Sequence, residues 1–465
     1  MSMNVNILMC VGLALIVALT MIVQGSTRKT DLISFRNFFL SGFILFQLSS
    51  ATLTFVTGEW GDTPVAYPER TGFVFSCFAL VFLTLFFIAY RRGWWVKRLA
   101  VRAQDDIPAP SPASMLTIAF TCMVIGLLFR TVLIYVYLLG KLTDPIGNGL
   151  LAIAAALAMW AWAPRLLNPL VAFFAVLIII GSMLGVLQHS QGRRDLVGVL
   201  AAVAWGAYHA HWKHMGLKWS LLRLAPPTVA ALVLLAAITS TRRSSEQRSV
   251  GKVFSDMAHA DLANGFLQLA SGQEAGPISM WLIETRPGEF AYDHLHMLRY
   301  TVCAPIPRDW WKGKPSAIGF DLVKQARIKN KAPEYNTGPG ILGHVGNDNP
   351  FIALWMYPLL FGLLMRLLDE VVDRSPNNPF VILPMGTCIG EIIALARGET
   401  GLFLFRAITT IVIAWVAMRV VVWLLRTVLG YAVRYDESEA DEHTPDPGTD
   451  AWPDSDQPAE PLVIR

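Results

Sequence analysis

Charged residues are scarce in this sequence. Asp, Glu, Lys and Arg make up 15% of its 465 residues, whereas about one quarter is usual for a soluble domain. Hydrophobic residues make up 54% of the chain. So low a charge content excludes an ordinary soluble globular protein and indicates a polytopic protein embedded in a lipid bilayer.

The sequence also lacks the motifs of several other classes. It has no Gly-rich phosphate loop that leads into a helix, which argues against ATP hydrolysis, and no internal repeat of about 20 to 50 residues. Four of the five cysteines fall in apolar segments, and only Cys303 lies in a polar one. We therefore expect neither a disulfide framework nor a cysteine metal site, and no cofactor, bound metal or nucleic-acid partner.

Long apolar runs predict an all-α fold of about eleven transmembrane helices. Residues 1–238 hold eight spans, and residues 350–430 hold three. Between them, residues 239–349 form one large extracytoplasmic loop containing short helices. Residues 431–465 include ten acidic residues and no Lys or Arg between positions 436 and 460, so we expect a disordered cytoplasmic tail. The predicted spans are 5–23, 34–56, 71–90, 115–139, 147–163, 166–187, 196–212, 222–238, 350–368, 380–396 and 401–425.

Basic residues predict the orientation. The short loops on one side hold Arg70, Lys141, Arg193, Arg194 and Arg397. The other side holds many more, among them Arg91, Arg92, Lys97, Arg98 and Arg102 after the third span. Basic loops stay inside, so the N-terminus and the large loop face outward. In a bacterium this is the periplasmic side of the cytoplasmic (inner) membrane.

Two segments of the large loop have apolar residues near helical spacing, at 253–270 and 277–283. Such helices either lie along the membrane surface, roofing a site, or pack on the core of the loop itself.

The next part of the loop is basic. Residues 299–331 contain eight Lys or Arg and two Asp. This run is either a solvated surface or an anion site. An anion site is possible because each arginine guanidinium can bind two phosphate oxygens at once. Trp310 and Trp311 lie within it. Adjacent indoles suit sugar stacking and also suit anchoring at the membrane interface.

His344 lies in a Gly-rich stretch, residues 338–350, that leads into the ninth span. Its ordinary pKa near 6.5 suits a proton acceptor, but the glycines and the histidine could equally form a structural turn. Near the last two spans, Glu391 could pair with Arg406 or Arg130 to hold helices together. Arg397, in the short outer turn between these two spans, is the better candidate for binding a ligand.

These residues resemble the bacterial O-antigen polymerase family, also called oligosaccharide repeat-unit polymerases. The family pattern Pro-Arg-x-x-Trp-x-x-Lys-Pro appears at residues 307–315, a Gly-rich approach to a helix follows, and an Arg-Gly-acid turn appears as Arg397-Gly398-Glu399. The likeness covers residues 289–406. One departure is Gly343-His344, where the family pattern has Gly-Glu.

The resemblance implies an inverting, metal-independent glycosyl transfer between polyprenyl-diphosphate-linked oligosaccharides at the outer leaflet, making O-antigen or exopolysaccharide. Flippase and chain-length regulator proteins are the implied partners, besides the lipid bilayer. The expected roles are Arg308, Arg397, and Arg299 or Arg406 on the diphosphate; Lys314 assisting; His344 or Glu399 accepting the proton; and Trp310 or Trp311 stacking on sugar.

Four alternatives stay open. An O-antigen ligase differs in its acceptor. A glycosyltransferase that uses polyprenyl-phosphate sugars would need acidic metal ligands, for which Glu59 and Asp62 are candidates. A transporter of lipid-linked saccharides would show repeated halves and broken helices, and a membrane scaffold would need no site at all.

Overall fold

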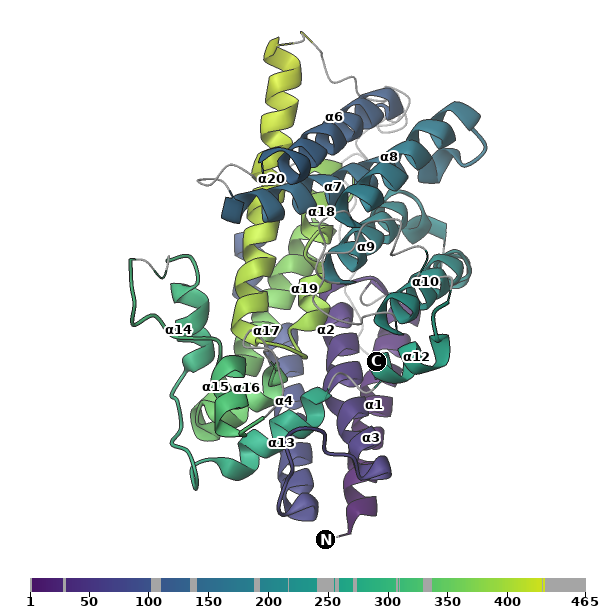
Figure 1. The fold of residues 1–465 in the computed structure, drawn as a ribbon. Helices are drawn as coiled ribbons and strands as arrows, with labels where there is room; N and C mark the ends of the chain where they lie inside the picture. The colour runs from purple at the N-terminus through teal and green to yellow at the C-terminus, as the bar shows by residue number, and fades with distance from the viewer. Residues whose placement is uncertain are drawn as a thin grey trace, which may run out of the picture.

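The computed structural model describes residues 2–27, 31–101, 110–133, 140–187, 193–215, 217–240, 255, 259–270, 274–306, 308, 310–328, 337–428 and 430. Every regular element within these ranges is a helix (Figure 1), as the apolar composition predicts. Several predicted features lie outside the described residues: the acidic tail, and Val253, Phe254, Met257, Lys329 and Lys331.

Nine helices in the described ranges are long and apolar enough to cross a bilayer. The chain is therefore a multi-pass helical membrane protein. The nine are Met3–Ser26, Phe35–Thr57, Pro68–Arg92, Pro112–Thr131, Ile146–Arg165, Pro169–Leu187, Lys218–Ser240, Pro350–Asp373 and Thr400–Val428.

The other two predicted spans correspond to shorter apolar helices, Leu196–Ala210 and Pro379–Ala394. The second of these is divided into α18 (Pro379–Gly386) and α19 (Ile389–Ala394). The break falls at Thr387 and Cys388, whose N–H groups donate at 3.3 Å to the carbonyls of Pro384 and Met385, three residues back, instead of continuing the α-helical pattern. The expectation of one continuous tenth helix is therefore wrong.

One bundle consists of α1 (Met3–Ser26), α2 (Phe35–Phe43), α4 (Pro68–Arg92) and α17 (Pro350–Asp373). Phe39 lies at its centre, with ring centroids 4.9 Å from Phe86 and 5.6 Å from Phe361. Gly362 allows α17 to approach α4 closely, since a Cβ there would lie 2.6 Å from the Phe86 carbonyl oxygen. Small residues at such crossings are typical of membrane helix packing.

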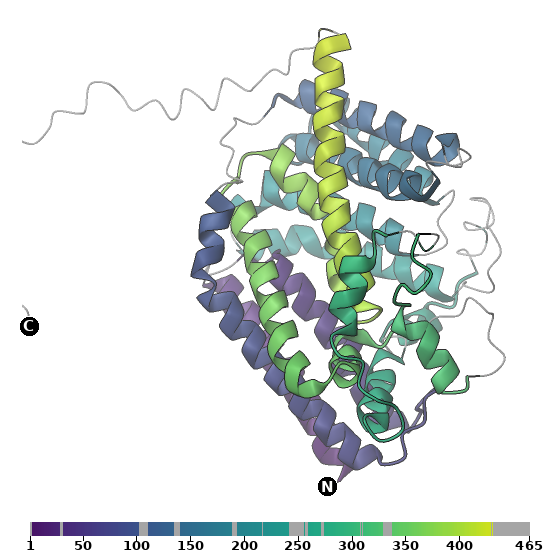
Figure 2. The ribbon, with the colours of Figure 1, turned by 90° about the vertical axis from the view of Figure 1, so that its left-hand side faces the viewer.

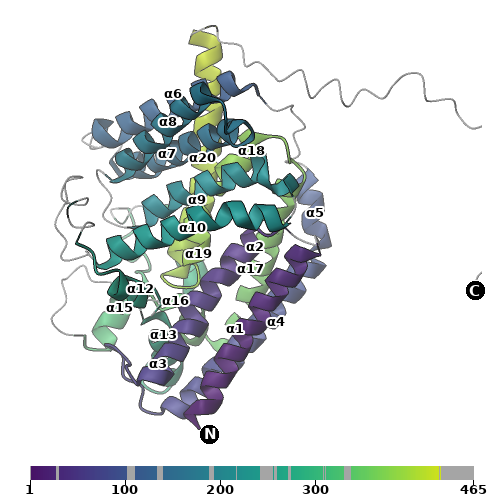
Figure 3. The ribbon, with the colours of Figure 1, turned by 90° about the vertical axis from the view of Figure 1, so that its right-hand side faces the viewer.

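A second group of helices lies across the first, as Figures 2 and 3 show. The Ala-rich α7 is at its centre, and the Trp205 indole of α9 joins the group to α18 by donating to the Ile382 carbonyl at 2.9 Å. The group comprises α6 (Pro112–Thr131), α7 (Gly140–Trp162), α8 (Pro169–Leu187), α9 (Arg193–Ala210) and α10 (Leu217–Ser240), with α5 (Trp94–Val101) leading to it and the 3₁₀ turns η3 (Ala163–Arg165) and η4 (Trp212–Met215) between helices.

Short helices gather in the half of the molecule that Figure 1 draws toward the N-terminus. They are α12 (Leu262–Ala270), α13 (Ala275–Thr285), α14 (His296–Cys303), α15 (Ile318–Gln325) and α16 (Gly340–Asn347). The second span also ends here, after its π-helical turn η1 (Ile44–Ser49) and α3 (Ser50–Thr57), and α20 (Thr400–Val428) begins here.

The predicted helix at 277–283 is present as α13, and it packs inside the protein rather than on the membrane surface. Residues 275–282 are all buried. Glu284 fixes its end by accepting hydrogen bonds at 2.7 Å from the backbone N–H groups of Ala66 and Tyr67, just before α4. Of the two readings for this segment, the structure supports packing on the core.

Candidate functional site

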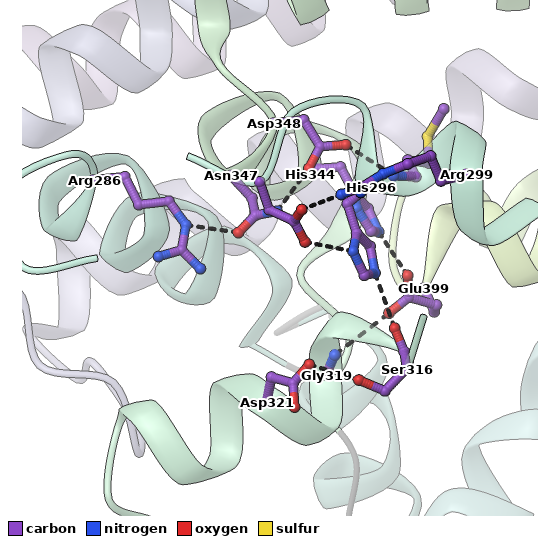
Figure 4. Close-up of polar contacts among 12 residues, drawn as sticks. Arg286, His296, Arg299, Ser316, Gly319, Asp321, His344, Asn347, Asp348 and Glu399 are labelled. Carbon is purple, nitrogen blue, oxygen red and sulfur yellow. Dashed lines mark hydrogen bonds and ion pairs between the residues drawn. The ribbon is translucent and has the colours of Figure 1, made fainter. Parts of the chain in front are cut away.

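Two of the short helices begin on buried carboxylates. Asp348 accepts a hydrogen bond at 2.9 Å from the Met297 N–H in the first turn of α14, and also accepts one from the Tyr357 hydroxyl. Glu399 accepts one at 3.4 Å from the Gly319 N–H in the first turn of α15. A carboxylate at a helix N-terminus satisfies orphan donors and complements the helix dipole. Figure 4 shows both arrangements.

Glu399 also faces His344, and both side chains are buried. The Glu399 Oε1 and His344 Nε2 atoms are 3.3 Å apart, while Nε2 also lies 3.2 Å from the Thr400 N–H, which donates to it. Burial raises the pKa of Glu399 to about 7 and lowers the pKa of His344 to about 3. Burial thus disfavours the charged forms of both Glu399 and His344. The contact between them is therefore best explained by a protonated Glu399 carboxyl that donates to a neutral His344 imidazole.

His296 lies beside this pair and is held on both ring nitrogens. Its Nδ1 is 2.6 Å from Asp293 Oδ2, and its Nε2 donates to the Ser316 carbonyl at 2.9 Å. Burial lowers the pKa of His296, but the hydrogen bond to Asp293 and the charges of Asp293, Asp348 and Glu399 outweigh it, so the net pKa is raised. His296 is therefore an imidazolium that ties α14 to the residue preceding α15.

An amide and a guanidinium extend the network away from α14. Asn347 donates to Asp348 Oδ1 at 2.6 Å and accepts from Arg286 Nε at 2.6 Å, and Arg286 also donates to Gln325 at 3.2 Å. Burial lowers the pKa of Arg286, opposed by the charges of Asp293 and Asp348. One network thus joins α13, α14, α15, α16 and the start of α20.

Exposed cations and indoles lie beside the network. Arg308 and Arg406 come from the turn after α14 and from α20, and both are exposed. Burial and the Glu399 charge raise the pKa of Tyr300, while the charges of Arg406 and Arg308 oppose that rise. Both arginines therefore lie close enough to Tyr300 to act on its hydroxyl. Trp310 and Trp311 are exposed as well.

The other predicted site residues have structural contacts. Arg299 pairs with Asp293. Lys314 Nζ donates at 2.8 Å to the carbonyls of Ala304 and Ile306 and so closes the turn after α14. The Arg397 guanidinium lies 5.6 Å from the Phe46 ring centroid of η1.

Arg130 contacts the side chain of Asn148 and, at 3.4 Å, the Val186 carbonyl. The suggested pairing of Glu391 with Arg406 or Arg130 stays a prediction. Glu391 itself lies in α19 and is half-buried.

Most of the Gly-rich stretch around His344 is a helix, α16, and not the turn that was one of the two readings for these glycines. A Cβ at Gly346 would lie 2.7 Å from the Ile283 Cγ1 atom, and one at Gly343 would lie 3.2 Å from the Leu282 Cδ1 and Ser279 Oγ atoms. The glycines therefore allow α16 to pack closely on α13. Gly340 alone has a positive φ, +66°, at the start of the helix, and its N–H donates to the Gly398 carbonyl at 3.1 Å.

Sequence reasoning missed Asp293, His296 and Asp348 as members of the network. A signal existed for two of them: Asp293 and His296 are three residues apart, a spacing at which helical side chains meet. Asp348 lies in Gly-Asn-Asp-Asn directly before a helix, which is typical of a capping sequence. In this protein Asp348 caps a different helix, α14, and the sequence does not predict that α14 lies close to Asp348.

Within the described residues, no three His, Cys, Asp or Glu side chains are arranged to hold a metal ion. Comparison with protein-family models, with curated proteins and with solved structures finds no match for this chain. The class that the fold defines is that of a helical multi-pass membrane protein.

Proposed function

We propose that this protein is a membrane glycosyltransferase that polymerises polyprenyl-diphosphate-linked oligosaccharide repeat units into O-antigen or exopolysaccharide. It acts at the outer leaflet of the bacterial inner membrane, with inversion and without a metal. One observation carries the proposal: the charges of Arg308 and Arg406, from separate segments, act on the Tyr300 hydroxyl together with the charge of the buried Glu399, and the exposed Trp310 and Trp311 closely follow Arg308 in the chain.

The chemistry of the leaving group explains the arginines. In the transfer, the acceptor hydroxyl oxygen attacks the sugar C1 atom while the bond from C1 to the diphosphate oxygen breaks. The electron pair of that bond leaves with the diphosphate, whose negative charge grows. Cations fixed beside the leaving oxygen stabilise this transition state most. Arg308 and Arg406 hold the diphosphate, with Arg299 and Arg397 at its edge and Lys314 shaping the turn.

The proton of the acceptor goes to Glu399. Its pKa of about 7 is near the working pH, which is the condition for an effective general base. His344, with a pKa of about 3, is a weak base that orients the Glu399 carboxyl. Because Gly319 N–H contacts the other Glu399 oxygen, the start of α15 must shift for a hydroxyl to reach the carboxylate.

Replacing Arg308 or Arg406 with Ala tests the proposal. Losing one such cation costs about 100-fold or more in turnover, so each variant should make only very short glycans on gels. The matched control is Arg70→Ala, because Arg70 is an exposed arginine in the first turn of α4. Wild-type chain lengths in stably expressed R308A and R406A proteins would contradict the proposal.

Two further assays separate the close alternatives. A ligase would transfer finished polymer to lipid A and would not lengthen it. A metal-dependent glycosyltransferase would lose activity with EDTA and regain it with divalent metal. Its candidate Glu59 is exposed in the loop between α3 and α4.

A transporter of lipid-linked saccharide is the second candidate function. The break between α18 and α19, near Glu391, favours it, because discontinuous helices form the substrate sites of many transporters. Movement of lipid-linked saccharide across proteoliposomes without a change in glycan length would support this candidate.

A further inference from the structure

Helix α14 and the turn after it lie alongside the first turns of α20. Thr301 Oγ1 donates to the Gly401 carbonyl at 3.1 Å, and a Cβ on Gly401 would lie 2.7 Å from the Met297 carbonyl oxygen. Figures 1 and 2 both show α14 beside the lower part of α20. Helix α14 therefore lies next to a membrane span and not above it, and the turn that follows continues from this helix.

The length of α20 sets the depth of this segment. At about 1.5 Å per residue, its 29 residues extend about 43 Å, close to the full thickness of a bilayer with its headgroups. The headgroup layer on each side is about 5 to 8 Å thick. The first turn or so of α20, and the part of α14 that touches it, thus fall in that layer.

The side chains exposed here suit such a layer. Val302 and Trp310 are 75% and 83% exposed, and Ile306 is 37% exposed. Several large apolar side chains exposed together indicate a contact surface, whereas one alone would not. Arg308 and Lys312, also exposed, lie among them. Apolar rings and chains beside cations complement lipid chains beside phosphate groups.

Two backbone carbonyls of the turn also have hydrogen-bond donors within the protein, so they do not need water. Lys314 donates to the carbonyls of Ala304 and Ile306, which follow the last residue of α14. Carbonyls at a helix C-terminus otherwise need water, and a cation there also complements the helix dipole. Irregular backbone near membrane depth requires such internal partners.

We propose that this surface, made of Val302, Ile306, Trp310 and Lys312, is a membrane-surface anchor that inserts into the phospholipid leaflet at this end of α20. The occupant is the bilayer itself. Val302, Ile306 and Trp310 contact lipid chains, while Lys312 contacts phospholipid phosphates. The anchor does not depend on the glycosyltransferase proposal.

Spin labelling in proteoliposomes tests the anchor. Cys77 and Cys303, which are half-buried, are first replaced with Ser, and Cys10, Cys122 and Cys388 are fully buried. A nitroxide is then placed at Val302→Cys or Trp310→Cys. We expect it to collide several-fold more often with oxygen, which concentrates in lipid, than with a water-soluble nickel chelate.

The matched control is Glu289→Cys, since Glu289 is exposed in the loop between α13 and α14. Its nitroxide should show the opposite preference. Labels at positions 302 and 310 that prefer the nickel chelate would overturn the anchor, and so would labels shielded from both reagents, which would indicate a covering protein. Glycan synthesis by Arg308→Ala is measured in parallel, so a failure of the glycosyltransferase proposal is seen separately from a failure of insertion.

Discussion

Glu399 and His344 illustrate what a buried pair does at the residue scale. The Glu399 carboxyl has a folded pKa of about 7 against an ordinary value of 4.5, because burial disfavours its charge. Folding therefore favours the protonated carboxyl. This stabilisation is fully present below pH 4.5 and is lost as the pH rises to about 7.

Replacing Glu399 with Gln should consequently stabilise the protein above neutral pH. A shift of one pKa unit corresponds to about 1.4 kcal/mol, so the gain at pH 8 should reach at most about 3 kcal/mol. At pH 4.5 and below the variant should match the wild type. Thermal unfolding in detergent at both pH values measures this. Glycan synthesis should be lost, since the amide cannot accept a proton.

A Glu399→Gln protein that is less stable than the wild type at pH 8 would show that the fold stabilises the ionised carboxylate, which would contradict a raised pKa of Glu399. His344→Asn is the companion variant. It removes the imidazole from the pair and should leave the pH dependence that arises from Glu399 largely in place.

Both residues of this pair could be selected from the sequence, since each is an ionisable side chain beside a predicted span. Their contact could not be predicted. The contact depends on the packing of α16 onto α13. It also depends on the close approach of the turn at residues 397–399 to Gly338 and Gly340, which is a feature of the three-dimensional structure alone. Periodicity describes one helix at a time and carries no such tertiary information.

At the scale of elements, α14 and α15 depend on residues distant in the chain. Asp348 caps α14, Glu399 caps α15, and the His296 imidazolium holds the Ser316 carbonyl before α15. Isolated helices of eight residues are marginal, which is why their own sequences predict them poorly. The long apolar helices carry their signal locally and could be predicted.

Replacing His296 with Gln should loosen α15. The folded pKa of His296 is raised, so its stabilisation is fully present below pH 6.5 and is lost as the pH rises through the folded pKa. Hydrogen exchange of residues 318–325, corrected for intrinsic rates, should be about tenfold faster or more in H296Q at pH 6. The difference from the wild type should shrink at pH 9.

The comparison segment for this measurement is α13, residues 275–285, which is buried in the core. Its exchange should change little in the variant. Equal protection of α15 in both proteins at pH 6 would mean that the His296 contact does not hold this helix in solution.

At the scale of the whole molecule, α4 and α17 each carry basic residues near their C-terminal ends, and the orientation that these residues indicate stays a prediction. The start of α4 and the helices α13 to α16 lie at the end near the N-terminus, whereas Arg92, Arg366 and Arg374 lie at the far ends of α4 and α17. The crossing of α6 to α10 over the other helices was beyond prediction, because it depends on which apolar faces meet.

Cysteine labelling should establish sidedness. In the background without Cys77 and Cys303, Glu289→Cys should react with an impermeant maleimide in intact spheroplasts. Arg374→Cys should react only after permeabilisation. The reverse pattern would place the candidate site in the cytoplasm and would remove the outer-leaflet transfer from consideration.

The most direct test of the proposed function is reconstitution of the purified protein with a defined polyprenyl-diphosphate-linked repeat unit. Products are resolved by length on a gel, with EDTA present. The proposal predicts a ladder that lengthens with time in the wild type and in Arg70→Ala, and that stops at the first products in Arg308→Ala. Folded wild-type protein that leaves the repeat unit unchanged would contradict it.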